Sequence, residues 1–390
     1  MTSTLIPRLS ISTHEFRAAT GRAFAVATTS RALAAAILVC AVLAPSALAQ
    51  KDKEKDTVHL RGDKVESGVI DDEEYAGLTL EGKGGAKKLF PWSEIVGIEY
   101  AGAAELSAAQ SALSSGKFAD AAAGFDAVLK TDKLRAPLKQ EALFYLAVSN
   151  GKNGDEVGAL AAYREFVETF PKGRYVRPAA DHVVAALAGD GDFAGANTFL
   201  DKLADGSKTT AGFEAEVALL RGRVFEAQGK DKAADALAQY DGAAKVVGIT
   251  AAAQAEISLG RGRALQLQGK RVDAETIFRA LTTAENSGPV LAGAWNGIGE
   301  MLAEEGKSKR DSEKILDALY CHLRGVVQYR PLDGEATVEY ERALAGSSTC
   351  FKFISELAQN PEQKRLYSER SREKMDQLRR EFPSSPYLKN

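Results

Sequence analysis

The sequence is poor in the side chains that most often carry out catalysis or bind metals. Its 390 residues include only three cysteines, three methionines and four histidines. Three of the histidines, His59, His182 and His322, lie in separate segments without a second ligand at a metal-binding spacing. Motifs typical of zinc proteases, phosphate-binding loops, redox cysteine pairs and serine hydrolases are also missing. The sequence therefore predicts a protein that is not an enzyme and needs no metal or cofactor.

Proline is scarce as well, and positive charge is not in excess. Eleven prolines and 35 glycines, with 45% apolar and 26% charged residues, are ordinary for a folded protein and argue against a disordered or fibrous chain. The formal net charge is −3. Nucleic-acid-binding proteins usually carry a basic excess, so we expect no nucleic-acid partner.

The first 49 residues have the pattern of a secretory signal peptide. An apolar run over residues 32–43 follows Arg31, and Ala47-Leu48-Ala49 gives the small-residue pattern of a cleavage site. The run is short for a membrane span, although an uncleaved anchor is an alternative. We expect export, with Gln50 as the mature N-terminus and a charged, solvated leader over residues 50–56.

Cleavage would leave two cysteines, Cys321 and Cys350, in the exported chain. They are candidates for a disulfide, because an oxidising compartment allows the bond to form. The alternative is two buried thiols in a helical core, since cysteine is among the most buried residue types. The sequence does not give the distance between them, so both alternatives stay open.

Residues 57–101 predict a small β domain of short strands separated by glycine-rich turns. The apolar residues that carry the pattern are Val58, Leu60, Val65, Val69, Ile70, Leu78, Leu80, Trp92, Ile95 and Ile98. Their order resembles the Sm-like and SH3-like small barrels, and this resemblance implies a barrel-like fold. Sm-like proteins often bind RNA, but an exported acidic chain would rarely meet RNA, so we expect the fold without that ligand.

From residue 103 to residue 331 the pattern becomes helical and repetitive. The ten-residue phrase beginning at Arg221 recurs at Arg261 with an offset of about 40 residues, a distance typical of stacked repeats. Glycine also recurs at similar intervals, which indicates helical hairpins that each turn at a glycine. The predicted turns are at Gly116, Gly154, Gly191, Gly229, Gly269 and Gly306.

One of these units carries the marker residues of a known repeat. They are Leu143, Leu146, Ala147, Gly154, Ala159, Tyr163 and Pro171. The unit resembles a tetratricopeptide (TPR) repeat, which implies an α-solenoid of antiparallel helix pairs. Two departures from the family pattern stand out: the period is longer than usual, and the last unit has Asp311 where a small residue is expected.

Two segments share a phenylalanine-proline pair followed by a tyrosine, ending at Tyr175 and at Tyr387. This ending resembles TPR proteins of the bacterial cell envelope, which implies a periplasmic or envelope location. Beyond residue 331 the repeat becomes irregular. We expect helices over residues 334–344, 350–357 and 362–382, which together form an irregular helical cap over residues 332–390.

The fold class predicted from these features is mainly α. It is a TPR-like α-solenoid of about six to seven antiparallel helix pairs, preceded by the small β-barrel-like domain. The resemblance to TPR proteins places Arg223 and Arg263 on the face of the first helices that forms a concave groove, with Glu226 and Gln266 three residues further on. Two matched guanidinium groups can bind the carboxylates of an extended acidic peptide.

The alternative for the two arginines is a structural one. Arg223 and Arg263 can instead pair with acids of neighbouring helices, such as Glu216 or Glu256. In both alternatives the other arginines of the phrase, Arg221 and Arg261, fall at the edge of the packing, where their stems cover apolar surface.

We therefore expect an exported scaffold that holds a partner protein or peptide in the concave groove. A structural spacer or self-assembling envelope component without a groove ligand is the first alternative. An enzyme subunit is a second one, disfavoured by the missing catalytic motifs. Neither the partner nor the oligomeric state follows from the sequence.

Overall fold

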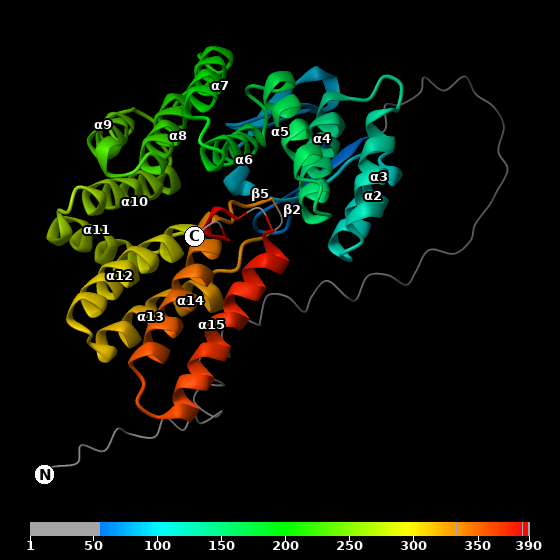
Figure 1. Ribbon diagram of the computed structural model, residues 1–390. Helices are drawn as coiled ribbons and strands as arrows, with labels where there is room; N and C mark the ends of the chain where they lie inside the picture. The colour runs from blue at the N-terminus through cyan, green and yellow to red at the C-terminus, as the bar shows by residue number, and fades with distance from the viewer. Residues whose placement is uncertain (1–54, 333, 384, 389–390) are drawn as a thin grey trace, which may run out of the picture. The chain divides into compact units, whose positions relative to one another are not determined.

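The computed structural model describes residues 55–332, 334–383 and 385–388 (Figure 1). The predicted signal peptide, residues 1–49, lies outside these ranges, as do residues 50–54 of the predicted leader. Within the described ranges, five strands are followed by 14 α-helices. None of these helices is long and apolar enough to cross a membrane.

The strands form one antiparallel sheet. They are β1 (Asp56–Leu60), β2 (Lys64–Glu74), β3 (Gly77–Glu81), β4 (Lys87–Phe90) and β5 (Ile95–Glu99). Their order is β4-β3-β2-β1-β5, so the last strand returns to pair with the first and β4 and β5 form the two edges. The buried core of the sheet consists of Val58, Leu60, Ile70, Leu78, Leu80 and Phe90. The small β domain predicted from the alternating apolar residues is thus present.

The long strand β2 links the two halves of the sheet. Its first half pairs with β1 and its second half with β3, and the register shifts between Ile70 and Asp72. A shift of this kind is a β-bulge, which bends a strand and increases its twist. The C-terminal end of β2, Glu73 and Glu74, lies beyond the bulge and reaches the helical array.

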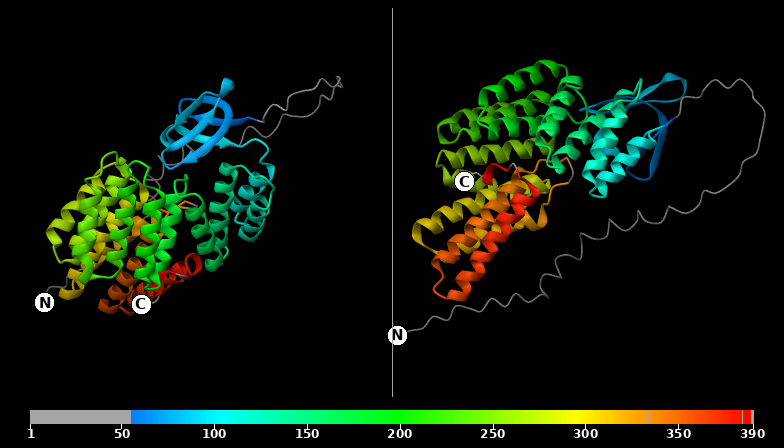
Figure 2. Two further views of the ribbon diagram at one scale, coloured as in Figure 1. Left: turned by 90° about the horizontal axis from the view of Figure 1, so that it is seen from above. Right: turned by 45° about the vertical axis from the view of Figure 1, so that its right-hand side comes forward.

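The helices form antiparallel pairs, each with a first and a second helix (Figures 1 and 2). The first helices are α2 (Ala104–Ser114), α4 (Ala136–Lys152), α6 (Val176–Gly189), α8 (Phe213–Ala227), α10 (Ala251–Leu267), α12 (Gly288–Lys309) and α14 (Val338–Leu357). The second helices are α3 (Phe118–Leu129), α5 (Glu156–Thr169), α7 (Phe193–Gly206), α9 (Ala233–Ala243), α11 (Arg271–Thr283), α13 (Ser312–Gln328) and α15 (Pro361–Glu381). Successive first helices from α6 to α14 also contact one another. The predicted solenoid of helix pairs is therefore confirmed.

Five of the six predicted glycine turns are present. Each has the left-handed backbone that glycine adopts easily at the end of a helix. Their φ angles are 73° at Gly116, 84° at Gly154, 77° at Gly191, 84° at Gly229 and 76° at Gly269.

The prediction of a turn at Gly306 is wrong. Helix α12 has 22 residues and continues to Lys309, and the left-handed residue at its end is Arg310, with φ 53°. A Cβ atom on Gly306 would lie 2.8 Å from Cδ1 of Ile315, so this glycine allows close packing of α12 on α13. Asp311 caps α13 by accepting hydrogen bonds from backbone N–H groups, which explains its departure from the repeat pattern.

The C-terminal region differs from the prediction in its helix boundaries. The two helices expected over residues 334–344 and 350–357 are one continuous helix, α14, whereas α15 lies close to the range expected for the last helix. Helices α14 and α15 pack on each other as another antiparallel pair. The described part of the chain thus has seven pairs.

Glycines in and beside the duplicated phrase allow aromatic rings to pack between first helices. A Cβ atom on Gly222 of α8 or Gly260 of α10 would lie within 2.5 Å of the ring of Tyr240. Such contacts are closer than any side chain tolerates. The ring of Tyr240 therefore fits between two successive first helices only because both positions are glycine.

The same arrangement recurs in the next two units. The ring of Phe278 lies between α10 and α12, and the ring of His322 lies between α12 and α14. The glycines that face these two rings are Gly262 and Gly297 for Phe278, and Gly299 and Gly346 for His322. The repetition of Arg-Gly-Arg thus reflects repeated helix packing.

Candidate functional site

The end of the β2–β3 hairpin fixes the β domain to the helical array through backbone hydrogen bonds. The amide of Tyr75 donates to the carbonyl of Lys172 over 2.7 Å. The amide of Arg174 and the side chain of Gln140 both donate to the carbonyl of Glu73, over 3.1 and 3.0 Å. Because backbone groups on both sides take part, the connection between α5 and α6 is held at a fixed place against the hairpin.

The side chain of Tyr75 extends this contact to α8. Its ring packs edge to face on Phe213, with 5.0 Å between ring centroids, and its hydroxyl donates to Glu216 over 2.7 Å. Burial raises the pKa of the Tyr75 hydroxyl above its ordinary value, and the nearby Glu216 carboxylate raises it further. The neutral hydroxyl is therefore a stable donor.

Asp56 forms a second anchor and corrects the sequence analysis. It was expected in the solvated leader, but it begins β1 and is fully buried. Its carboxylate accepts two hydrogen bonds from the guanidinium of Arg135, both over 2.8 Å, and one each from the amides of Ile70 and Ala101. Burial alone would raise the pKa of Asp56, but these bonds outweigh it and lower the pKa. The sequence hid this role because Arg135 is 79 residues away.

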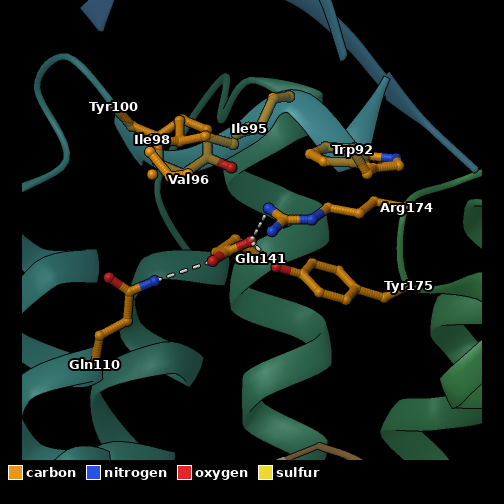
Figure 3. A pocket seen from close by; sticks show the side chains of 10 residues that line it. Trp92, Ile95, Val96, Ile98, Tyr100, Gln110, Glu141, Arg174 and Tyr175 are labelled. Carbon is orange, nitrogen blue, oxygen red and sulfur yellow. Dashed lines mark hydrogen bonds and ion pairs between the residues drawn. The ribbon is translucent and has the colours of Figure 1, made fainter. Parts of the chain in front are cut away.

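A pocket of about 400 Å³ opens where β5 faces the first helical pairs (Figure 3). Figure 3 shows the β5 side chains and Trp92 on one side, and Gln110, Glu141 and Tyr175 on the other. The lining residues are Trp92, Ile95, Val96, Gly97, Ile98, Tyr100, Gln110, Glu141, Arg174 and Tyr175. Apolar groups from the sheet thus face polar groups from the helices.

Arg174 lies flat between two aromatic rings in this pocket. Its guanidinium carbon is 4.3 Å from the centroid of Trp92 and 4.7 Å from that of Tyr175. Rings at this distance attract a cation and fix the plane of the guanidinium. The indole of Trp92 is held in turn by a 2.8 Å hydrogen bond to the carbonyl of Glu74. The hairpin that docks the β domain therefore also positions the pocket wall.

Two buried carboxylates share this one arginine. Nη1 of Arg174 is 3.6 Å from Oε2 of Glu141 and 3.9 Å from Oε2 of Glu73. Glu141 also accepts hydrogen bonds from Tyr175, over 2.6 Å, and from Gln110, over 3.1 Å. Burial raises the pKa of Glu141 although Arg174 and Tyr175 lower it.

Glu73 is the less compensated of the two carboxylates. Its Oε1 accepts a 2.6 Å hydrogen bond from Tyr100, whereas its Oε2 accepts none from the described residues. Burial raises the pKa of Glu73 to about 7, with Arg174 and Tyr100 lowering it and the nearby carboxylates Glu141 and Asp56 raising it. When both glutamates are ionised, the site carries one more negative charge than positive charge.

The histidines of the described residues do not line this pocket. Within the described ranges no group of three histidine, cysteine or acidic side chains is placed to hold a metal ion. The histidines are separate: His59 contacts the exposed Glu99, His182 stacks on Tyr163, and His322 is buried. Burial also lowers the pKa of His322 to about 4, so that its ring is neutral in the core.

Arg223 lies on the first-helix face but is engaged inside the array. It pairs with Asp181 of α6 over 2.5 Å and with Glu256 of α10 over 2.9 Å. Arg177 of α6 contacts the same two acids and also Glu216. Glu256 is one of the two partners named in the structural alternative of the sequence analysis. A chain of ion pairs thus joins α6, α8 and α10 and continues to the β domain through Tyr75.

The other predicted site residues are likewise in contact with neighbouring helices. Arg263 pairs with Glu339 of α14 and lies 3.8 Å from Glu226 of α8, and only 11% of its side chain is exposed. Gln266 donates to Glu300 of α12 over 3.1 Å. The proposed role of Arg223, Arg263, Glu226 and Gln266 in partner binding stays a prediction, because binding there would replace these internal contacts.

Arg221 and Arg261 are partly exposed, and each pairs with an acid of the preceding second helix. Arg221 pairs with Asp201 of α7, and Arg261 pairs with Asp241 of α9 over 2.8 Å. Both acids are also 40 residues apart. The duplicated phrase therefore carries an outer ion pair that repeats with the unit.

Cys321 and Cys350 are both buried and are free thiols in the structure. Burial raises the pKa of Cys321 to about 11 and that of Cys350 to about 12. Both side chains belong to apolar clusters of the last units. This is the arrangement that the sequence left open as the alternative to a disulfide.

The pocket residues were not identified from the sequence. Trp92 comes from the β domain, Glu141 from α4, and Arg174 from the α5–α6 connection. Glu73 of β2 does not line the pocket but lies near Arg174. One signal was available: Glu141 precedes an apolar run in α4 at a position that packs inside the array. A buried acid in such a run requires a partner elsewhere in the fold.

Comparison with known proteins supports the repeat. The family model described as tetratricopeptide repeat matches residues 141–173, which extend from α4 through α5. Repeats of this type build scaffolds for protein–protein interaction. A comparison with curated protein sequences finds no match.

The solved structures similar to the chain include the following three. A tetratricopeptide repeat protein from Parabacteroides merdae is 14% identical, with a TM-score of 0.40, and the match covers 69% of this chain and 97% of that chain. A human IFIT1 dimer with m7Gppp-AAAA is 11% identical, with a TM-score of 0.34 and coverage of 70% and 71%. The TPR domain of P58(IPK) is 15% identical, with a TM-score of 0.19 and coverage of 70% and 98%.

Proposed function

We propose that this protein is an exported scaffold that holds a partner protein in the bacterial envelope. The observation that carries the proposal is the pocket at the junction of β5 and the first helical pairs. Its walls are held by hydrogen bonds within the β domain, within the array and between the two, so a partner meets a preorganised surface. The signal-peptide pattern of residues 1–49 and the envelope-type ending at Tyr175 support export.

Partner binding in the first-helix groove is part of the same proposal. Arg223 and Arg263 would bind acidic groups of the partner by exchanging them for their internal acids. Charge reversal is a poor test of this idea, because Arg223→Glu would place a third acid beside Asp181 and Glu256 and weaken the stack itself.

A structural spacer or self-assembling component is the second candidate function. The internal ion pairs of Arg223 and Arg263 favour it, because both side chains already join neighbouring helices. In this alternative the array needs no ligand on its first-helix face.

Affinity capture of the tagged full chain from the envelope fraction, with light scattering of the purified protein, distinguishes the two functions. The scaffold proposal expects a stoichiometric partner of different sequence. A chain that is captured only with itself, as an oligomer of defined mass, would overturn the scaffold proposal and favour self-assembly.

Lysine substitutions test whether the partner occupies the groove. The double variant Arg223→Lys/Arg263→Lys keeps both charges but loses the planar guanidinium groups. The matched control is Arg221→Lys/Arg261→Lys, at the more exposed positions of the same phrase. If the groove is used, only the first variant loses the partner while its melting temperature stays near that of the matched variant. Unchanged capture by both would place the partner elsewhere.

N-terminal sequencing of the protein recovered from the periplasm tests export. The expected mature N-terminus is Gln50. Recovery of the uncleaved chain from the cytoplasm would contradict this part of the proposal.

A further inference from the structure

The outer edge of β5 is available for pairing with another strand. β5 pairs with β1 on one side, between Thr57 and Glu99 at one end and Leu60 and Ile95 at the other, and it ends the sheet in the described part of the chain. An edge strand presents unpaired N–H and C=O groups, to which an extended peptide can add as a further strand.

The junction pocket runs along this strand. Four consecutive residues of β5, from Ile95 to Ile98, line the pocket, and the side chain of Val96 is 64% exposed. A peptide that pairs with β5 would therefore have side chains next to the pocket. Ile95, Ile98 and Trp92 offer an apolar wall for the aliphatic stem of a long side chain.

The charged groups at the pocket favour a cationic group at the end of that side chain. Glu73 and Glu141 are buried carboxylates, and Arg174 is the cation that faces both. Oε2 of Glu73 accepts no hydrogen bond from the described residues. Glu73 does not line the pocket, but it shares Arg174 with Glu141, so Glu141 is only partly compensated. An incompletely compensated buried carboxylate is costly, and a cation in the pocket would compensate Glu141.

Arg174 only partly compensates the two carboxylates. Its guanidinium is held between the rings of Trp92 and Tyr175, and its distances to the two carboxylates are longer than hydrogen bonds. Glu141 lines the pocket directly, with Gln110 and Tyr175 as its hydrogen-bond donors. An ammonium or guanidinium group that enters beside Val96 would meet the Glu141 carboxylate.

We propose that an extended segment of the partner protein pairs with β5 as a sixth strand and places a lysine or arginine side chain in the pocket beside Glu141. This inference rests on the proposed function as a scaffold and adds the chemistry of the partner segment. Strand pairing supplies affinity that does not depend on sequence, and the pocket selects a basic side chain with an apolar stem.

The inference can be tested with short labelled peptides, whose binding to the full chain is measured by fluorescence anisotropy. The probe is a blocked peptide of alternating valine and lysine, and two controls replace lysine by glutamate or methylate alternate backbone nitrogens. We expect the lysine peptide to bind, and each control to bind at least about tenfold more weakly, because one loses the cation and the other the strand hydrogen bonds.

Two matched variants locate the binding. Glu141→Gln keeps an acceptor for Tyr175 but removes the charge, and we expect it to weaken lysine-peptide binding about tenfold. Glu99→Gln removes the same charge at the end of β5, outside the pocket lining, where the carboxylate contacts His59, and we expect binding to be unchanged. A circular dichroism spectrum and melting temperature like those of the parent chain establish that each variant is folded.

Several outcomes would overturn the inference. These are no binding of the lysine peptide up to about 1 mM, equal binding of the glutamate or methylated peptide, or equal loss in both variants. A dimer of the full chain that Val96→Lys dissociates would show that a second copy occupies the edge. If affinity capture yields a stoichiometric partner while the peptide tests fail, the scaffold proposal survives and only the β5 site is wrong.

Discussion

Glu73 and Asp56 are buried carboxylates of the same small sheet, but their surroundings differ. Asp56 accepts four hydrogen bonds, two of them from Arg135, which together lower its pKa despite burial. Glu73 accepts one from Tyr100 and shares Arg174 with Glu141. The first carboxylate therefore stabilises the fold when ionised, whereas the ionisation of the second opposes folding.

Substitution of Glu73 by glutamine should change how stability depends on pH. The pKa of Glu73 is raised from 4.5 to about 7 in the folded protein, so between these values the folded state holds the proton more tightly and stability falls as pH rises. At pH 8 the penalty is on the order of 3 kcal/mol. Urea unfolding at pH 5 and pH 8 should therefore show that Glu73→Gln is stabilising mainly at the higher pH.

The groups that face Glu73 are Arg174, Tyr100, Glu141 and Asp56, and the glutamine variant keeps all of them. The matched control is Glu66→Gln, which removes an acid from the exposed part of the same strand, where it pairs with Lys88. This control should change stability by less than about 1 kcal/mol at either pH. An equal effect of both variants at pH 8 would mean that ionisation of Glu73 does not destabilise the folded state.

An aromatic ring between two glycines sets the spacing of successive first helices from α8 to α14. Tyr240, Phe278 and His322 come from successive second helices, and each meets a glycine of its own unit and one of the next. Because a glycine has no side chain, the two first helices can approach the ring from both sides.

Alanine at Gly262 should destabilise the array. The added Cβ would lie 2.6 Å from the ring of Phe278, and overpacking of this kind costs about 1–3 kcal/mol. The matched control is Gly242→Ala in α9, where a Cβ meets nothing within 4 Å and should stabilise the helix by about 0.5–1 kcal/mol. Chemical denaturation of both variants measures the difference. A neutral Gly262→Ala would contradict the packing role.

The more buried and the more exposed arginines of the duplicated phrase should differ in the same experiment, as Arg223 and Arg261 illustrate. Arg223 joins Asp181 and Glu256 with 26% of its side chain exposed, so Arg223→Ala should cost about 2–3 kcal/mol. Arg261 pairs with Asp241 at 42% exposure, and Arg261→Ala should cost less than about 1 kcal/mol. High salt should weaken the exposed pair of Arg261 with Asp241 more than the pairs of Arg223. Similar losses for both variants would show that Arg223 does not join the first helices.

The sequence predicted what depends on neighbouring residues. Helix pairs, five glycine turns and the alternation of the strands follow from local patterns, and the structure has them. The turn at Gly306 was misplaced because the contact that explains this glycine, with Ile315, lies in the next helix. The pocket and the pair of Asp56 with Arg135 were missed because the residues come together only when the β domain packs on the array.

Across the whole molecule, the described β domain and helical array are joined by backbone hydrogen bonds at the β2–β3 hairpin and by a few side chains that reach far along the sequence. Tyr75 contacts Phe213 and Glu216, about 140 residues later, and Glu216 continues through Arg177 to Glu256. Repeat arrays gain much of their stability from neighbouring units, so long-range contacts of this kind are needed for a single unfolding transition.

Replacement of Tyr75 by alanine should separate the unfolding of the two parts. In a Trp295→Phe background the fluorescence of Trp92 reports the β domain, while circular dichroism reports the helices. We expect the two urea transitions to coincide when Tyr75 is present. In Tyr75→Ala the fluorescence transition should move to lower urea, since the ring loses its packing on Phe213 and the hydroxyl its bond to Glu216.

Tyr75→Phe provides the graded control, because it removes only the hydrogen bond and keeps the ring contact with Phe213. Its fluorescence transition should fall between those of the parent and of Tyr75→Ala. The corresponding free energy of unfolding should be about 1 kcal/mol below that of the parent. If the two transitions coincide in all three proteins, the connection between the β domain and the array depends on the backbone hydrogen bonds at Glu73 and Lys172. If they are separate even with Tyr75 present, the β domain and the array are independent units, and the pocket between them is not preorganised.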